Sequence, residues 1–242
     1  MFSETDMFDL SPEIVSARKE LLTRKKQTVP VGSLLKWMDP RIIPQKISDF
    51  LPGESNFILD LPVFEDREPY DVAKKYVEMG FRVFSVSTNP FWNNGYDDYL
   101  SFLKRSKHTF PYPVIRRDLF FESYQIVETR LFWGDSFTIF PGVVDGERLK
   151  ILIEDAFNLE FEPVVVLNDE SDLKRLKKSG FHVPFIATNF KLFMKMKKKI
   201  MKLGSEIIVI AGSIEEVELS RESGAKLFWV NWELVDRNPG FF

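Results

Sequence analysis

The stretch EIIVIAGSIEEVELSRESGAKLFWVN, residues 206–231, contains one complete strand–helix–strand unit. Residues 206–212 and 226–231 are nearly continuous apolar runs, which are typical of parallel strands covered on both faces. Between them, residues 213–224 begin with Ser-x-x-Glu, the capping box of a helix start, and end at Gly224, a common helix terminator. The stretch therefore predicts a helix that crosses between two parallel strands.

The same alternation extends back along most of the chain. Eight strand-like runs are predicted, at residues 56–62, 82–88, 113–118, 136–142, 163–169, 183–189, 206–212 and 226–231. Helix-like segments alternate with them, and those at 71–80 and 169–180 each end in glycine. Eight strands that alternate with helices predict an α/β fold, the (β/α)₈ TIM barrel.

Both ends of the chain add to this barrel. Residues 11–51 are predicted to form two or three helices, with no Gly/Ser linker behind them, so we expect a single domain: a helical extension (1–55) packed on a barrel (56–242). The last helix should be truncated, because eleven residues follow the final strand and Pro239 and Gly240 are among them. The N-terminal helices, or a second subunit in a homodimer, would then cover the apolar surface beside the last repeat.

The composition excludes several classes of site. The chain has no cysteine, which rules out disulfides, thiolate metal sites and cysteine nucleophiles, and its two histidines are too few for most zinc sites. We therefore expect no metal and no cofactor. No apolar run approaches the roughly 18 residues that span a bilayer. Because the acidic start also lacks the features of a signal peptide, we expect a cytoplasmic protein without membrane contact.

The charge of the whole chain gives no signal for nucleic acid. Lysine and arginine total 33 and aspartate and glutamate 36, for a formal net charge of −3. Residues 191–202 form a basic helix-like run that could meet an acidic partner or RNA. A run of charge is usually a solvated helix face, so we expect no nucleic-acid binding.

PVIRRDLFFESYQIVE, residues 113–128, resembles the third-strand motif of indole-3-glycerol phosphate synthases, which typically reads Pro-Val-Leu-Arg-Lys-Asp-Phe, then Tyr-Gln-Ile and Glu. Residues 14–35, 84–89, 133–140 and 168–173 resemble other family segments in register. The resemblance implies the family's barrel and N-terminal extension. It also implies an enzyme that closes an indole ring on a carboxyphenylamino-deoxyribulose phosphate, with loss of carbon dioxide and water.

The resemblance further implies which positions would carry the chemistry. The family's lysine general acid on strand 3 matches Arg117, and its asparagine on strand 6 matches Asn189. On strand 1 the family's glutamate matches Asp60, while Pro62 stands in place of its lysine. Asp60, Arg117 and Asn189 are therefore the candidate catalytic residues.

Other family positions have lost their chemistry. The glutamates of strands 5 and 7 fall on Val166 and Ala211, and residues 65–67 replace the phosphate-binding loop after strand 1. A lysine pKa can be tuned until the group donates a proton near neutral pH, whereas a guanidinium stays charged. Losing one general acid typically costs about 10²–10⁴ in rate. The family's ordinary activity is therefore not expected, and the chain is interpreted as a pseudoenzyme.

What persists is a set of groups suited to an anion. Ile115 and Arg117 share the inward face of their strand and Arg116 takes the other. Gly212 and Ser213 open a helix whose free N–H groups form a ready anion site, and Asn189 lies on the neighbouring strand. In a barrel these groups belong to the C-terminal face, where ligands bind. They predict a small anionic metabolite, a phosphate or a carboxylate.

Alternatives remain at the level of the residues. Arg117 could instead pair with Asp60 across the barrel and fill a vacated site, because a buried arginine needs a partner. Residues 91–99 are interpreted as a packed loop, with an aromatic lid over the mouth as the alternative.

Two functions are open. The first is a divergent, non-catalytic barrel that binds an anionic metabolite or a partner protein. The second is an active indole-3-glycerol-phosphate synthase, a carboxy-lyase of tryptophan biosynthesis, or a lyase or isomerase that uses Asp60 and Arg117 in changed roles.

Overall fold

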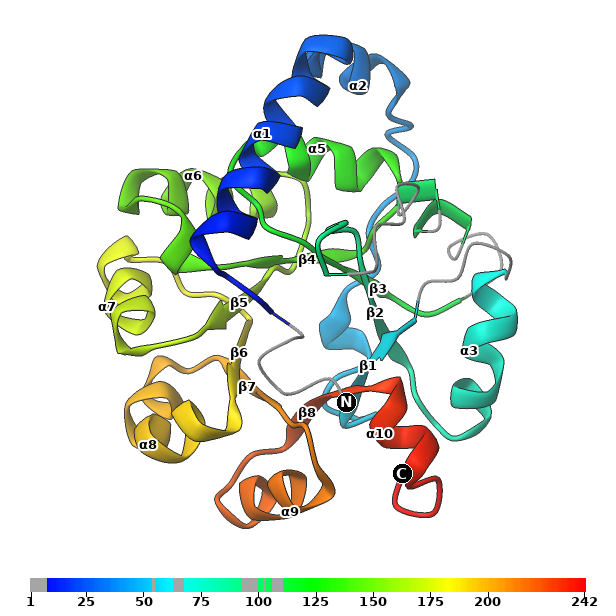
Figure 1. Ribbon diagram of the computed structural model, residues 1–242, viewed down its shortest axis with the longest axis vertical. Helices are drawn as coiled ribbons and strands as arrows, with labels where there is room; N and C mark the ends of the chain where they lie inside the picture. Colours follow the sequence, from blue (N-terminus) through cyan, green and yellow to red (C-terminus); the bar gives the residue numbers. More distant parts are fainter. Residues whose placement is uncertain (1–7, 54, 63–67, 93–99, 102, 106–110) are drawn as a thin grey trace.

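The protein is described here by a computed structural model, which covers residues 8–242 except 54, 63–67, 93–99, 102 and 106–110. Eight parallel strands pair in chain order, and β8 pairs with β1 to close the barrel (Figure 1). The predicted fold class is confirmed. The strands are β1 Phe57–Leu61, β2 Val83–Ser87, β3 Val114–Arg117, β4 Ser136–Ile139, β5 Val164–Leu167, β6 Phe185–Asn189, β7 Glu206–Ile210 and β8 Leu227–Asn231.

Helices surround this barrel and follow the strands in turn. They are α1 Pro12–Thr28, α2 Val31–Trp37, α3 Pro69–Glu78, α5 Ser123–Leu131, α6 Gly146–Asn158, α7 Glu170–Ser179, α8 Phe190–Ile200, α9 Ile214–Glu222 and α10 Trp232–Arg237. The described residues also form the short 3₁₀ helices η1 Ile47–Asp49, η2 Pro141–Val143 and η3 Met201–Leu203. The predicted helix starts hold, since the side chains of Asp169 and Ser213 cap α7 and α9. Gly180 ends α7 with a φ of +79°, a left-handed conformation that favours glycine.

The two N-terminal helices lie against α5 on the outside of the barrel (Figure 1). The Tyr124 hydroxyl of α5 donates to the carbonyl of Val29, which follows α1, at 3.0 Å. Leu22 and Leu34 of the two helices are buried in the same apolar core as the barrel residues. These contacts join the two helices to the apolar core of the barrel.

The last helix is truncated, as predicted, because α10 has six residues. The chain's own C-terminus covers the surface beside it: the ring of Phe242 lies 5.1 Å from that of Phe57 and 5.8 Å from that of Phe81, between centroids. Asp236 also accepts bonds from Lys75 and the Tyr76 hydroxyl of α3. The expectation that the N-terminal helices supply this cover is wrong, since contacts with α5 hold them elsewhere. The homodimer stays a prediction.

None of the helices in the described part of the chain combines the length and apolar character needed to cross a membrane.

Candidate functional site

An ion pair lies inside the barrel near the C-terminal ends of its strands. Arg117, the last residue of β3, donates from Nε to Asp60 Oδ1 at 3.0 Å and from Nη2 to Asp60 Oδ2 at 2.8 Å. The Ser85 hydroxyl of β2 donates to Asp60 Oδ1 at 2.6 Å. The two side chains are 5% and 9% exposed. Of the two roles considered for Arg117, pairing with Asp60 is the one in this structure.

Aromatic rings cover the Arg117 guanidinium. The rings of Phe8 and Trp92 both lie with their centroids 5.4 Å from its central carbon, within the range of cation–π contacts. Phe8 also packs against Phe140 and Trp229, with centroids 5.4 Å and 5.5 Å away. Residues 8–11, which precede α1, therefore reach over the mouth of the barrel and run toward the centre of Figure 1.

Hydrogen bonds hold this arrangement from both sides. The indole Nε1 of Trp92 donates to the carbonyl of Asp9 at 3.0 Å, which fastens the N-terminal segment to the loop after β2. The indole Nε1 of Trp229, on β8, donates to Ser85 Oγ at 3.0 Å. Trp229 is fully buried. Its indole thus fills barrel space beside the ion pair.

The electrostatics of Asp60 reflect this enclosure. Burial raises the pKa of the Asp60 carboxyl, and the Arg117 guanidinium and the Ser85 hydroxyl offset that effect only in part. A carboxylate in this setting depends on its cation for stability. The pair can hold charge in the mouth, but the Arg117 guanidinium cannot serve as a proton donor.

The other predicted anion-binding groups are engaged by their own helices. Asn189, the last residue of β6, accepts from the backbone N–H of Leu192 at 2.8 Å and so caps α8. The backbone N–H of Gly212 donates to the Glu216 carboxylate at 2.8 Å, and Ser213 Oγ accepts from the Glu216 N–H at 3.2 Å. A bound anion would have to compete with Glu216 at this helix start.

Two of the positions to which the resemblance assigns family glutamates are described by the structure. Val166 on β5 and Ala211 after β7 are buried and apolar. Residues 65–67 and 93–99 lie outside the described residues, so the altered phosphate loop and most of the predicted aromatic loop have no structural account. Within the described ranges, no group of three or more His, Asp or Glu residues is placed to hold a metal ion.

Sequence reasoning missed three residues that build the mouth: Phe8, Ser85 and Trp229. For Ser85 and Trp229 the sequence held a signal, because strand alternation places both side chains on the inward face of the barrel. A polar Ser85 and a large Trp229 within otherwise apolar strands indicate an interior that is partly polar and filled. Phe8 had no such signal, since it precedes the first helix and reaches the mouth through the fold.

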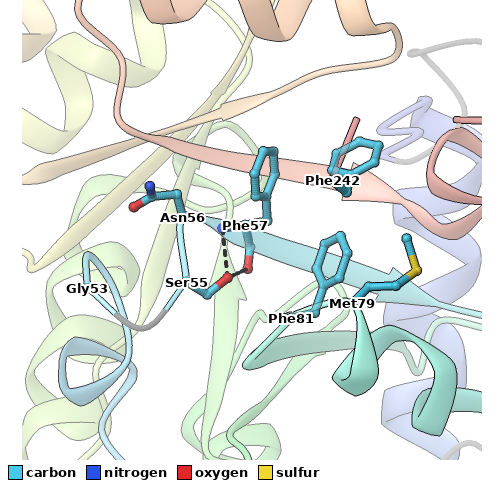
Figure 2. A pocket seen from close by; sticks show the side chains of 8 residues that line it. Gly53, Ser55, Asn56, Phe57, Met79, Phe81 and Phe242 are labelled. Atoms are coloured by element: carbon cyan, nitrogen blue, oxygen red, sulfur yellow. Dashed lines mark hydrogen bonds between the residues drawn. The ribbon is translucent and has the colours of Figure 1, made fainter. Parts of the chain in front are cut away.

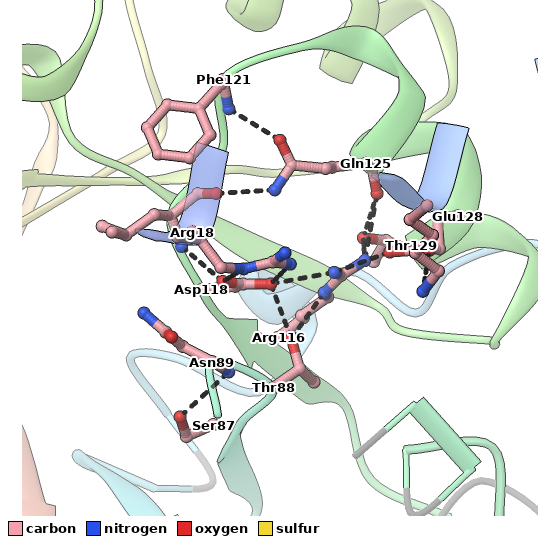
Figure 3. A network of polar contacts seen from close by, with 12 residues as sticks. Arg18, Ser87, Thr88, Asn89, Arg116, Asp118, Phe121, Gln125, Glu128 and Thr129 are labelled. Atoms are coloured by element: carbon pink, nitrogen blue, oxygen red, sulfur yellow. Dashed lines mark hydrogen bonds and ion pairs between the residues drawn. The ribbon is translucent and has the colours of Figure 1, made fainter. Parts of the chain in front are cut away.

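A second polar network lies outside the barrel, between β3, α5 and α1 (Figure 3). Arg116 points away from the barrel interior, as strand alternation predicted, and its Nη2 contacts Asp118 at 2.9 Å and Glu128 at 2.8 Å. From α1, Arg18 forms two bonds with Asp118, at 2.9 Å and 2.6 Å, and Lys25 pairs with Glu128 at 2.5 Å. These contacts attach the N-terminal extension to the strand that carries Arg117.

A pocket of about 220 Å³ lies at the opposite end of the barrel, where β1 and β2 begin (Figure 2). Ser55 at its edge is occupied locally, since its hydroxyl bonds with the backbone of Phe57. Ligands of such barrels bind at the other end, so this pocket is not the candidate site. Its lining consists of Gly53, Ser55, Asn56, Phe57, Met79, Gly80, Phe81 and Phe242.

Residues 61–231 match a family model described as indole-3-glycerol phosphate synthase. This chain belongs to that family. The indole-3-glycerol phosphate synthase of Campylobacter fetus is 29% identical over 173 residues, 67% of this chain and 66% of the relative. The enzyme of Campylobacter curvus is 25% identical over 229 residues, 87% of both chains, and that of a Polaromonas species (strain JS666) is 31% identical over 196 residues, 76% and 72%.

Solved structures share the fold of this family member. A dihydropteroate synthase from Coxiella burnetii, in complex with pteroic acid, superposes with a TM-score of 0.55 at 11% identity, over 78% of this chain and 92% of that one. A 3-hexulose-6-phosphate synthase gives 0.53 at 13% identity, over 73% and 90%. At such identities the likeness concerns the barrel alone.

Proposed function

We propose that this member of the indole-3-glycerol phosphate synthase family does not close the indole ring. The observation that carries the proposal is the state of Arg117. It stands where the family has its lysine general acid, and it is held by Asp60 beneath Phe8 and Trp92. A guanidinium in that position keeps its proton, so the step that needs a donor lacks one.

The remaining positions support the same conclusion. Val166 and Ala211 stand where the resemblance implies glutamates, and Pro62 stands where it implies a second lysine. Effects within one catalytic constellation are not additive, but loss of the acid together with its carboxylate partners leaves little of the mechanism.

The test is turnover of the family's carboxyphenylamino-deoxyribulose phosphate by the purified chain, followed by formation of the indole product. The Campylobacter fetus relative, assayed in parallel, is the positive control. We expect no product from this chain, and none from an Arg117→Lys variant, since the other positions stay substituted. Clear turnover by the unmodified chain would favour the alternative, an active synthase of tryptophan biosynthesis.

A second candidate function is the binding of a small anionic metabolite at the mouth. Arg117 already holds a carboxylate with two parallel bonds, the geometry in which arginine binds carboxylates and phosphates. A metabolite would replace Asp60 on the guanidinium, with Asn189, Gly212 and Ser213 as further contacts. Because it must also displace Asp60 and compete with Glu216, we expect weak affinity.

Binding of inorganic phosphate and of small carboxylates, measured by thermal shift and calorimetry, tests this candidate. An Asp60→Asn variant removes the competing charge and should bind the anion more tightly than the unmodified chain. Arg117→Ala should weaken binding by about 1.5–3 kcal/mol, the range for a charge-assisted hydrogen bond. If Asp60→Asn gives no gain for any of the anions, the mouth is structural and this second function is rejected.

A further inference from the structure

Two neighbouring helices, α7 and α8, carry most of the positive charge on one side of the barrel. Residues 170–204 contain ten lysines and arginines and two carboxylates, a formal charge of +8. The rest of the chain has 23 basic and 34 acidic residues, a formal charge of −11. The net charge of −3 therefore hides a strongly segregated distribution.

Most lysines of these two helices face the solvent. Lys174, Lys177 and Lys178 on α7 and Lys191, Lys195 and Lys198 on α8 are all exposed; we call these six residues the basic face. The two helices lie side by side on the barrel (Figure 1), and Lys199 of α8 bonds Glu170 of α7 at 2.9 Å. In the sequence the basic run 191–202 stands apart from the lysines of α7, and the fold brings the two together.

Little negative charge neutralises this face. Of the two carboxylates, Asp172 is 2% exposed and lies under the surface, and Glu170 is already paired with Lys199. Among the described residues, none of the six lysines of the basic face forms an ion pair, although Lys174 and Lys195 interact with the charge of Glu170 over a longer distance. Exposed carboxylates return on the flanking helices, at Glu154 of α6 and Glu218 of α9. The basic face is thus a band two helices wide with acidic borders.

The residue types of the band indicate what it binds. Lysine is depleted in protein–protein interfaces, where aromatic residues and arginine predominate. A lysine ammonium binds phosphates as a point charge, and contacts with the phosphates of a polymer backbone act through electrostatics and counterion release. Residues 170–204 contain no tryptophan or tyrosine, and none of their phenylalanines is exposed, so this surface offers few aromatic rings on which bases could stack.

The spacing of the lysines on α8 fits such a backbone. Lys191, Lys195 and Lys198 follow one another by four and three residues and so share one side of the helix. They extend over about 10 Å of helix, which is roughly three nucleotides of a strand at about 3.4 Å each. The lysines of α7 run beside them.

We propose that the basic face binds the sugar–phosphate backbone of a nucleic acid without reading its bases. This inference is independent of the proposed function, because it concerns the outside of the barrel and not its mouth. Binding of this kind is salt-dependent and largely indifferent to sequence.

The test uses the full chain with a labelled oligouridylate and a labelled DNA duplex of equal length, followed by fluorescence anisotropy. We expect binding that weakens by about tenfold or more between about 50 mM and 200 mM salt. A variant with Lys177→Glu, Lys195→Glu and Lys198→Glu should lose about tenfold or more in affinity at the lower salt concentration.

A matched variant controls for the change in net charge. Lys36→Glu, Lys74→Glu and Lys226→Glu alter three exposed lysines outside the basic face and should leave affinity within about threefold of the original. Circular dichroism checks that both variants fold. Absence of binding at low salt, or equal losses in the two variants, would overturn the proposal. Competition by polyglutamate as effective as that by unlabelled oligouridylate would also overturn it, in favour of an acidic protein partner.

Discussion

At the scale of single residues, Arg117 and Asp60 form an ion pair whose members are both almost removed from water. Taking two such charges out of water costs several kcal/mol for each ion, and the pair recovers this only through its geometry and its further hydrogen bonds. Here two guanidinium–carboxylate bonds and the Ser85 hydroxyl supply them. The folded chain should therefore lose less stability when both partners are replaced by apolar residues than when only one is replaced.

A double-mutant comparison tests this. Arg117→Met leaves the Asp60 carboxylate buried without its cation and should lower the free energy of unfolding by about 3–5 kcal/mol. Adding Asp60→Leu removes the orphaned charge and should recover most of that loss. Urea unfolding of the two variants and the original measures both steps. A double variant as unstable as Arg117→Met alone would show that the charges are not coupled.

The direction in which strand side chains point, and one ion pair, could be predicted from the sequence, but the docking of the N-terminal helix could not. Strand alternation was enough to place Arg117 inward and Arg116 outward. Asp60 could be named as a partner of Arg117 because the resemblance places it on the first strand of the same barrel. The contact of Arg18 with Asp118 joins residues 100 positions apart, and no local pattern encodes where α1 docks.

At the scale of elements, buried charges attach α1 to β3 and α5. Burial alone raises the pKa of Asp118, but the guanidinium groups of Arg18 and Arg116 outweigh it and hold that pKa well below its ordinary range. Burial likewise raises the pKa of Glu128, and Arg116 and Lys25 lower it by more. Both carboxylates are thus favoured in their charged form by the docked extension.

This docking predicts a loss of stability in acid. A carboxyl whose pKa is lower in the folded chain contributes stability that is complete above its unfolded pKa of about 4 and is lost as the pH falls toward its folded pKa. The free energy of unfolding should therefore decline below about pH 4, and less steeply in an Arg18→Met variant, in which the pKa of Asp118 is lowered less. Urea unfolding across this pH range gives both slopes.

The raised pKa of Asp60 changes the free energy of unfolding in the opposite direction as the pH falls, but it does so equally in all the proteins compared. Arg24→Met, on the exposed side of α1, removes a pair with Glu20 that is open to solvent and should leave the slope unchanged. Equal slopes for Arg18→Met and the original would contradict the role given to Arg18.

Phe8, which precedes α1, covers the mouth of the barrel. Its ring packs on Arg117, Phe140, Trp92 and Trp229. Phe8→Ala should lower the free energy of unfolding by about 1–2 kcal/mol, less than for a fully buried ring. It should also raise acrylamide quenching of tryptophan fluorescence, since two indoles lose their cover. Phe91→Ala, at an exposed ring nearby, is the matched control and should change neither measurement appreciably.

At the scale of the whole molecule, the closure of the barrel could be predicted from the sequence, but the residues that cover its last repeat could not. Eight apolar runs with helices between them admit few other arrangements. What covers the last repeat depends on where Phe241 and Phe242 fold back, and a terminal Phe-Phe carries no periodic signal. The charge separation between residues 170–204 and the rest was present in the sequence, but its meaning required α7 and α8 to be placed side by side.

The C-terminal cover gives the last prediction. Phe242 packs against Phe57 and Phe81, and Phe241 against Phe242, at the end of the barrel where β1 and β2 begin. Changing both terminal phenylalanines to alanine should lower the free energy of unfolding by about 2–4 kcal/mol, from the apolar area returned to water. Thermal and urea unfolding measure the loss. Light scattering should also show concentration-dependent association, because the uncovered aromatic surface lies beside β8 and β1. Leu219→Ala, at an exposed position on α9, is the control. An unchanged stability in the double variant would mean that the barrel is closed without its C-terminal residues.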